Sequence, residues 1–245
     1  MSIQWVAHRG ECQSKIENTL SSINDAIKSG ITNIEIDVQL SKDGIPVLFH
    51  DRNLSRMAKR NDTITALDSS VIQQLILAPD NNAHLDQKTD KIPTLSDVVT
   101  LIGQHPKITL FVEVKKINFL TFSYQNVYKK IVDTLNPILS QTVIISFSYR
   151  FLMLCRHQCQ QNIGYVLPSW QQFNKKMLTK LQPKYIFCDE LIIPKTFQFK
   201  NTTIHWVLYE ISDISQAKYY VNRGVQYLES FHTGKLQQQL SSDLF

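Results

Sequence analysis

Short runs of β-branched and aromatic residues alternate with amphipathic helical stretches along most of the 245-residue chain. Such alternation is typical of parallel sheets whose strands are joined by helices. We expect strands at Ile3–Ala7, Asn33–Val38, Ile108–Val114, Val143–Ser146, Gly164–Leu167, Tyr185–Cys188, Ile204–Leu208 and Val225–Leu228. Eight strands of this kind indicate a closed barrel, so the sequence predicts an α/β fold of the TIM (β/α)8 type.

Helical patterns lie between these strands, with Gly30 as a stop for the first and Thr94 or Ser96 as a cap for LSDVVTLI. The expected helices are Thr19–Ser29, Leu95–Ile102, Tyr124–Leu135, Arg150–Gln161, Gln171–Leu181 and Ser215–Asn222, with a last helix in the tail Leu236–Phe245. A Rossmann-type sheet would need a glycine-rich turn after the first strand, and Ala7–Glu11 is not one. The length suits a single domain over residues 1–245.

The segment between His50 and Pro93 breaks the alternation and is polar. A long loop-rich insertion inside a domain is usually functional or disordered. We therefore expect residues 51–92, approximately, to form a small cap over the barrel mouth after the second strand. Its apolar stretch, Val71–Leu77, is expected to be either a packed helix or an exposed patch.

The charge, hydropathy and cysteine content of the chain indicate which ligands and surroundings to expect. The formal net charge is +5 and is scattered, which favours anionic ligands in general and does not indicate a nucleic-acid-binding protein. The sequence has neither a membrane-span candidate nor a secretory signal at its start, so stable membrane insertion is not expected. Four cysteines without a CxxC pair predict reduced thiols and a cytoplasmic protein. Cys155 and Cys159 are spaced to share one helix face.

The second expected strand carries two carboxylates in strict alternation with branched apolar residues. Ile34, Ile36 and Val38 should face the outer helices, which turns Glu35 and Asp37 toward the barrel interior. Two like charges on adjacent inward positions repel each other and are costly to bury without a partner. A divalent cation compensates them, and oxygen ligands favour Mg²⁺, Ca²⁺ or Mn²⁺ over zinc.

Glu113 and Lys115 repeat this pattern on the third strand. Glu113 would complete the metal site, and Lys115 would hold a phosphate oxygen; the alternative is an internal ion pair between the two. His8 and Arg9 end the first strand, where barrels place their chemistry. A turn at Ser41–Gly44 would bring His50 back over the carboxylates. Imidazoles titrate near neutral pH, so His8 and His50 suit general acid and base roles, with Arg9 and Lys115 stabilising charge.

These residues fall into blocks that resemble the signature of glycerophosphodiester phosphodiesterases. The blocks are His8-Arg9-Gly10, Glu17-Asn18-Thr19, Glu35-x-Asp37-Val38, Lys42-Asp43-Gly44-x-Pro46-Val47, His50-Asp51, Ile92-Pro93-Thr94-Leu95, Glu113-x-Lys115 and Ser146-Phe147. The resemblance implies a TIM barrel that hydrolyses glycerophosphodiesters to glycerol 3-phosphate and an alcohol. It implies a divalent metal on Glu35, Asp37 and Glu113, the acid–base pair His8 and His50, and phosphate binding by Arg9 and Lys115. A glycerol hydroxyl would attack first, giving a cyclic phosphate that water opens.

The C-terminal third departs from the family pattern. Trp206-Val207-Leu208-Tyr209 stands where the family usually has Trp-Thr-Val-Asn, and the last strand lacks the usual Gly-x-Asp-Gly ending. Trp206 is expected to line the substrate, with a core tryptophan as the alternative, and Tyr209 and Glu229 to reshape the alcohol side. Two other functions stay open: a lysophospholipase D or phosphatidylinositol-phospholipase-C-like lipid phosphodiesterase, and a non-catalytic phosphodiester-binding relative. The alcohol, the metal and the oligomeric state are not determined by the sequence.

Overall fold

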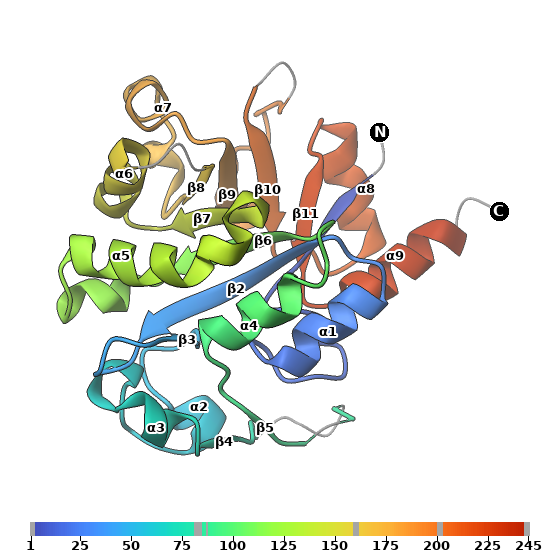
Figure 1. Cartoon of the computed structure of the whole chain (residues 1–245). Helices are drawn as coiled ribbons and strands as arrows, with labels where there is room; N and C mark the ends of the chain where they lie inside the picture. Colours follow the sequence, from blue (N-terminus) through green and yellow to red (C-terminus); the bar gives the residue numbers. More distant parts are fainter. Residues whose placement is uncertain (1–2, 81–84, 87, 159–161, 200–202, 243–245) are drawn as a thin grey trace.

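Eight parallel strands form a closed barrel in the computed structural model, which describes residues 3–80, 85–86, 88–158, 162–199 and 203–242 (Figure 1). They are β1 (Gln4–Ala7), β2 (Asn33–Leu40), β6 (Thr109–Val114), β7 (Thr142–Ser146), β8 (Ile163–Val166), β9 (Tyr185–Asp189), β10 (His205–Tyr209) and β11 (Tyr227–Ser230). The last strand, β11, pairs in parallel with β1, which also pairs with β2, and this closes the barrel. The predicted TIM barrel is confirmed.

Helices surround the barrel where the sequence predicted them. They are α1 (Leu20–Lys28), α4 (Leu95–Ile102), α5 (Tyr124–Leu135), α6 (Tyr149–Gln158), α7 (Lys175–Leu181), α8 (Ile214–Asn222) and α9 (Thr233–Ser242), and short 3-10 segments lie at Lys116–Leu120, Asn136–Gln141, Trp170–Gln172 and Glu190–Ile192. Thr19 and Thr94 each form a capping box at the start of α1 and α4, and such caps contribute about 1 kcal/mol each. The helix expected from Gln171 begins only at Lys175, after the N-cap Asn174.

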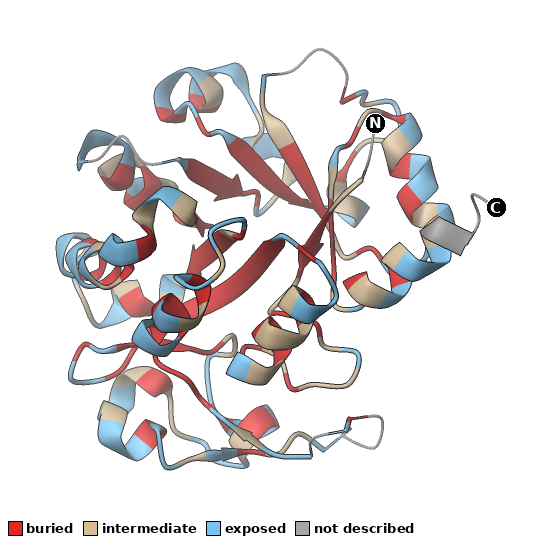
Figure 2. Cartoon of the chain, turned by 45° about the vertical axis from the view of Figure 1, so that its right-hand side comes forward, coloured by how far each residue is buried: buried red, intermediate tan, exposed pale blue. Residues whose placement is uncertain are grey.

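The strands bury both of their faces (Figure 2). On β2, Ile34, Ile36 and Val38 point outward into the large core under the helices. A second cluster fills the barrel itself, and it consists of Val6, Phe111, Val143, Ile145, Val166, Tyr185, Phe187 and Val207. The alternation predicted for β2 is therefore present, and it leaves Glu35 and Asp37 on the inner face.

The expected insertion forms a small lobe beside the carboxyl end of β2 (Figure 1). After β3 (Pro46–Leu48), which runs antiparallel to β2, it contains α2 (Ser55–Ala58), a 3-10 turn (Ile64–Ala66), α3 (Ser69–Ile72) and the pair β4 (Ile76–Leu77) and β5 (Asp90–Lys91). The lobe has its own hydrophobic cluster, made of Ile16, Val47, Phe49, Leu54, Met57, Ile64, Ile72, Leu77, Leu85 and Ile92. The stretch Val71–Leu77 is not one packed helix, because α3 ends at Ile72 and Ile76 begins a strand.

Two smaller expectations concern membranes and thiols. Within the described residues, no helix combines the length and the apolar character that a membrane crossing requires. Cys12 and Cys188 carry free thiols. Cys155 is buried in α6, whereas Cys159 lies outside the described residues, so the shared helix face stays a prediction.

Candidate active site

A cavity of about 90 Å³ opens at the carboxyl ends of the strands. It is lined by His8, Arg9, Glu35, His50, Glu113, Lys115, Ile145, Phe147, Val166, Phe187, Tyr209 and Glu229. Of the residues predicted for the site, only Asp37 and Trp206 are missing from this lining. Asp37 lies directly behind it, within 3.1 Å of both Arg9 and Lys115. The carboxyl end of such a barrel is where TIM-barrel enzymes carry out chemistry.

The first wall of the cavity is the tight turn after β1. Arg9 adopts a left-handed backbone conformation with φ of 59°, and Gly10 follows with φ of 86°. A side chain at Gly10 would clash with the Ser22 hydroxyl on α1, so only glycine fits there. In this conformation the Arg9 amide donates to Glu35 Oε2 at 3.1 Å. A left-handed non-glycine residue costs about 1 kcal/mol or more, and such strain is concentrated at functional sites.

Asp37 is the most strongly paired acid of the site. Arg9 Nε lies 3.0 Å from its Oδ2, Lys115 Nζ lies 3.1 Å from its Oδ1, and the Asn18 amide donates to it at 2.8 Å. Burial opposes ionisation of Asp37, but Lys115 and Arg9 outweigh it and hold the pKa of this carboxyl below its usual range. Asp37 therefore stays charged inside the barrel.

Three further buried carboxyls have the opposite tendency. Burial, and then repulsion by neighbouring carboxylates, raises the pKa of Glu35 and of Glu229 well above the ordinary value. Burial also raises the pKa of Glu113, although Lys115 works against the shift. The buried oxygens Glu35 Oε1 and Glu229 Oε1 have no hydrogen-bond partner among the described residues. Ionisation of such buried acids is costly unless a cation compensates the charge.

Two groups of acidic and imidazole side chains converge closely enough to hold a metal ion. Ligand atoms of Glu35, Asp37 and Glu113 all lie within 4.8 Å of one another. The same is true of His8, Glu35 and Glu229. Lys115 Nζ meanwhile lies 2.8 Å from Glu113 Oε1, so the internal Glu–Lys pair that the sequence left as an alternative is also present.

His50 returns to the site through β3, as the sequence predicted. β3 pairs with the end of β2, where Leu48 lies opposite Val38, and the Phe49 amide donates to the carbonyl oxygen of Asp37 at 3.0 Å. The Gln39 side chain fastens the next turn by donating to the carbonyl oxygens of residues 49, 50 and 51 at 2.9, 3.2 and 2.7 Å. The ring of His50 is then oriented by Asp51, with Nδ1 2.8 Å from Oδ1.

His8 has a carboxylate partner of its own. Its Nδ1 lies 2.6 Å from Glu210 Oε2, directly after β10, and the other oxygen of Glu210 accepts from the Phe231 amide at 2.9 Å. The Phe231 ring stacks on the His8 imidazole with centroids 4.3 Å apart. Both histidines thus have Nδ1 engaged by a carboxylate, which leaves Nε2 as the atom that can exchange a proton with a substrate.

The lobe reaches the site through Arg56, at the start of α2. Its guanidinium pairs with Asp51, through Nε at 2.7 Å, and with Glu17, through Nη2 at 2.7 Å. Glu17 in turn accepts from Arg9 Nη1 at 2.9 Å. One exposed arginine therefore holds both the partner of His50 and the partner of Arg9.

The expectation that Trp206 lines the substrate is wrong. Trp206 is 3% exposed and points away from the barrel interior, into a cluster of aromatic rings with Trp170, Phe173, Phe197 and Phe199. Side chains alternate along β10, so Val207 and Tyr209 face inward instead. The core alternative fits, and the aromatic residue of β10 that lines the cavity is Tyr209.

Sequence reasoning missed Glu210 and Phe231 and gave Glu229 only a minor role. The last strand was expected at Val225–Leu228, but β11 spans Tyr227–Ser230, which makes Glu229 a strand residue with its side chain in the cavity. Gly224 and Val225 resemble the start of a strand, so the strand was expected two residues too early and Glu229 fell beyond its end. The sequence carries no comparable signal for Glu210, which lies in the turn that follows β10.

Residues 8–192 match the model of the glycerophosphoryl diester phosphodiesterase family. The chain belongs to this family. The match includes every predicted site residue except Trp206, whereas Tyr209, Glu210 and Glu229 come from the part of the chain beyond it. The fold brings both parts to one cavity.

Known members of the glycerophosphoryl diester phosphodiesterase family resemble the chain to different extents. Glycerophosphodiester phosphodiesterase 1 of Mus musculus is 30% identical over 135 residues, which are 55% of this chain and 40% of that protein. The Homo sapiens protein of the same name is 36% identical over 113 residues, 46% of this chain and 34% of that protein. The chain thus spans about two fifths of the length of these curated relatives or less.

Solved structures match the fold over nearly the whole chain. A phosphodiesterase of Oleispira antarctica, in complex with the product sn-glycerol-3-phosphate, superposes with a TM-score of 0.86 at 27% identity, covering 97% of this chain and 96% of that one. A glycerophosphodiester phosphodiesterase of Thermotoga maritima gives a TM-score of 0.76 at 18% identity, with 98% and 99% covered. At such low identity the second likeness concerns the fold alone.

Proposed function

We propose that the protein hydrolyses glycerophosphodiesters to glycerol 3-phosphate and an alcohol, with a divalent cation and the two histidines His8 and His50. The observation that carries the proposal is the cavity in which these histidines face the acids Glu35 and Glu113 beside Arg9 and Lys115. Family membership and the glycerol 3-phosphate complex of the Oleispira antarctica phosphodiesterase support it. The proposal takes a small-molecule diester as partner, without nucleic acid and without stable membrane insertion.

The donor set fits a hard divalent cation. Four acids (Glu35, Asp37, Glu113 and Glu229) stand against two permanent cations (Arg9 and Lys115), so ionisation of all four acids would leave two negative charges for a metal ion to compensate. The buried oxygens Glu35 Oε1 and Glu229 Oε1 are of the type that Mg²⁺, Ca²⁺ and Mn²⁺ bind. We assign the metal to Glu35, Asp37 and Glu113, with Glu229 as an added acid of the same cavity. When bound, the cation would polarise the phosphoryl oxygens and offset the charge that develops on them.

The chain's own residues supply the proton transfers. In the first step one histidine takes the proton of the attacking glycerol hydroxyl as the new O–P bond forms. The other histidine gives a proton to the alcohol oxygen as its bond to phosphorus breaks. Water then opens the cyclic phosphate in the reverse sense, which returns both imidazoles to their starting protonation states. Asp51 and Glu210 keep the rings in orientation throughout.

Arg9 and Lys115 bind the phosphate in this proposal. The guanidinium of Arg9 is 11% exposed and Lys115 is 14% exposed, so each is fixed by carboxylates and still borders the cavity. Fixed cations that need no reorganisation stabilise developing negative charge most effectively. We also propose a cytoplasmic site of action, which the free thiols of Cys12 and Cys188 support.

Product release tests the proposal directly. Glycerol 3-phosphate is measured from glycerophosphodiesters with EDTA and with added Mg²⁺, Ca²⁺ or Mn²⁺, for the wild type and for His50→Ala and Glu35→Ala. We expect metal-dependent release that both variants lose while they keep their circular dichroism spectra. Release from lysolipids alone would favour the lipid phosphodiesterase, and tight binding of a diester without any product would favour the non-catalytic relative.

A further inference from the structure

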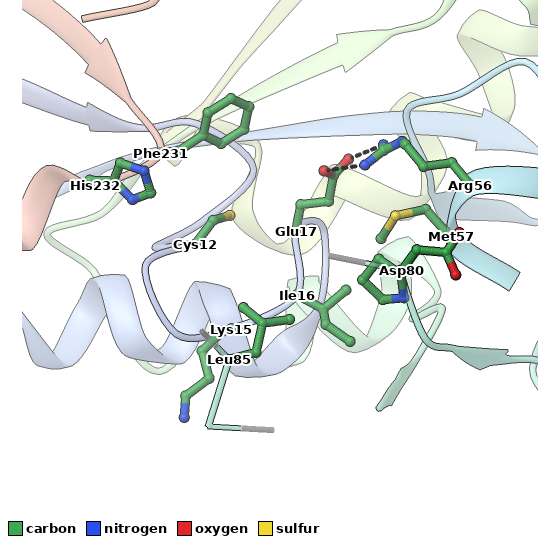
Figure 3. A pocket seen from close by; sticks show the side chains of 11 residues that line it. Cys12, Lys15, Ile16, Glu17, Arg56, Met57, Asp80, Leu85, Phe231 and His232 are labelled. Atoms are coloured by element: carbon green, nitrogen blue, oxygen red, sulfur yellow. Dashed lines mark hydrogen bonds and ion pairs between the residues drawn. The ribbon is translucent and has the colours of Figure 1, made fainter. Parts of the chain in front are cut away.

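A second and larger pocket, with a cavity volume of about 410 Å³, lies between the lobe and the barrel. Three segments form its walls: the loop between β1 and α1, the lobe, and the turn after β11. Its lining consists of Cys12, Lys15, Ile16, Glu17, Arg56, Met57, Pro79, Asp80, Leu85, Phe231 and His232. Figure 3 shows Phe231 and Cys12 on one side and Met57 on the other, with the Glu17–Arg56 ion pair between them.

This pocket adjoins the candidate active site, although no described residue belongs to both linings. The ring of Phe231 stacks on the His8 imidazole, and the guanidinium of Arg9 lies 5.3 Å from the centroid of the same ring. The thiol of Cys12 lies 3.6 Å from the carbonyl oxygens of both His8 and Arg9. Glu17 also connects the two, since it accepts from Arg9. An arm that leaves a phosphate bound by Arg9 and His8 on the side of Phe231 would therefore extend toward this pocket.

The pocket differs in chemistry from the cavity that holds the acids. Ile16, Met57 and Leu85 are buried and apolar, and Pro79, Cys12 and Phe231 extend the apolar lining. The charged groups at its edge already have partners: Glu17 pairs with Arg56, Lys15 lies 3.5 Å from Asp86, and Asp80 lies 2.9 Å from Lys59. The described carboxylates of the lining are thus neutralised, and such a pocket is suited to an uncharged group.

We propose that this pocket binds the alcohol arm of the substrate and selects diesters whose alcohol is apolar and uncharged. The inference rests on the proposed function and names the substrate class for it. The acid-lined cavity takes the phosphate and the glycerol, and the pocket beside Phe231 takes an alkyl group. A cationic arm such as choline would meet no unpaired carboxylate among the described residues of the lining.

A chain-length series on the wild-type protein is the first test. The kcat/KM values of glycerophosphoethanol, glycerophosphobutanol and glycerophosphohexanol are compared with the metal that supports activity. All substrate concentrations are kept below those at which the esters aggregate. Burial of each methylene should raise kcat/KM about two- to fourfold. A flat or falling series would overturn the proposal.

A pair of substrates matched in shape but different in charge is the sharper test. Glycerophosphocholine is compared with the glycerophospho ester of 3,3-dimethylbutanol, which has the shape of choline with carbon in place of the cationic nitrogen. We expect the uncharged ester to have the higher kcat/KM by about tenfold, as expected for a group that need not be desolvated with its charge. A higher kcat/KM for glycerophosphocholine would overturn the assignment.

Two variants test whether the chain-length dependence of kcat/KM arises in this pocket. Met57→Gln keeps the volume and introduces a polar group, so it should reduce the ratio of kcat/KM between the hexanol and ethanol esters severalfold. Val71→Gln is the matched control, because Val71 belongs to the same lobe and is 38% exposed outside the lining; its ratio should equal the wild-type ratio. If Met57→Gln and Val71→Gln give the same ratio, the pocket is not where the arm binds. Absence of product from every diester and metal would instead defeat the proposed function.

Discussion

Arg56 and Glu17 form a two-point ion pair, with Nη1 donating to Oε2 at 2.9 Å and Nη2 donating to Oε1 at 2.7 Å. The same guanidinium donates to both oxygens of Asp51, at 2.7 and 3.1 Å. Glu17 holds Arg9 and Asp51 holds His50, so a residue of the lobe aligns two groups on which the proposed reaction depends. Planar two-point contacts of this kind fix geometry as well as charge.

Replacing Arg56 should therefore reduce turnover. Arg56→Ala is expected to lower kcat about 10- to 100-fold, the usual cost of losing a residue that orients a catalytic group. Arg56→Lys should recover little, because an ammonium cannot form both two-point contacts. Arg60→Ala is the control, since Arg60 belongs to the same lobe and pairs only with Asp62 among the described residues. Equal activities for the Arg56 and Arg60 variants would contradict the assignment.

Glu210 should matter through His8. Glu210→Gln keeps the shape but removes the charge that orients the imidazole at 2.6 Å. We expect kcat to fall about 10- to 100-fold with little change in KM, because the ring loses its carboxylate partner. A variant that changes KM alone would show that Glu210 binds substrate instead.

Metal removal should destabilise the protein as well as inactivate it. Buried oxygens of Glu35 and Glu229 have no hydrogen-bond partner among the described residues, so a cation that binds only the folded state raises its stability by mass action. Thermal unfolding with EDTA and with saturating Mg²⁺ or Ca²⁺ measures this, and the transition should rise by several degrees with metal. In Glu35→Gln the rise should be much smaller. An equal rise in that variant would place the ion elsewhere.

Glu17 gives a pH-dependent contribution to stability. Burial opposes its ionisation, but Arg56 and Arg9 outweigh burial and lower the pKa of Glu17 in the folded state. A carboxyl with a depressed folded-state pKa stabilises the protein above its unfolded pKa of ~4.3 and loses that contribution as the pH falls through the folded pKa. Glu17→Gln should thus cost about 1–3 kcal/mol at pH 7, and this cost should shrink once the pH falls below ~4.3, as measured by urea unfolding. A cost that grows on acidification would contradict the ion pairs.

Trp206 should affect stability and not substrate binding. Trp206→Leu leaves a cavity among four aromatic rings and should lower the free energy of unfolding by about 2–4 kcal/mol. KM of the folded enzyme should stay within twofold of the wild type at a temperature where both are folded. A large increase in KM would return Trp206 to the substrate-lining role.

The parts of the site that were predicted share a local signal. Glu35, Asp37 and Glu113 stand among apolar neighbours with a period of two, so their own strands determine which way they point. Glu229 could not be placed in this way. The register of β11 depends on its partner β1, where Val6 lies opposite Glu229, and this pairing spans more than 200 residues.

The remaining misses have the same physical origin. Trp206 and Val207 are adjacent on β10, and either could have faced inward by alternation; the outward aromatic cluster decides between them. Arg56 and Glu210 lie outside the barrel strands. In such segments no alternation of apolar and polar residues indicates which way a side chain points. Long-range packing positions these residues, and a single sequence does not display it.

Closure of the barrel between β1 and β11 has a consequence for biosynthesis. His8 is made more than 200 residues before Glu210 and Glu229, and the histidine is aligned only after those later residues have folded against it. A growing polypeptide can hold the acids of β2 and β6 long before it holds an oriented His8. Catalytic competence should therefore appear only when the final strand has left the ribosome and joined the first.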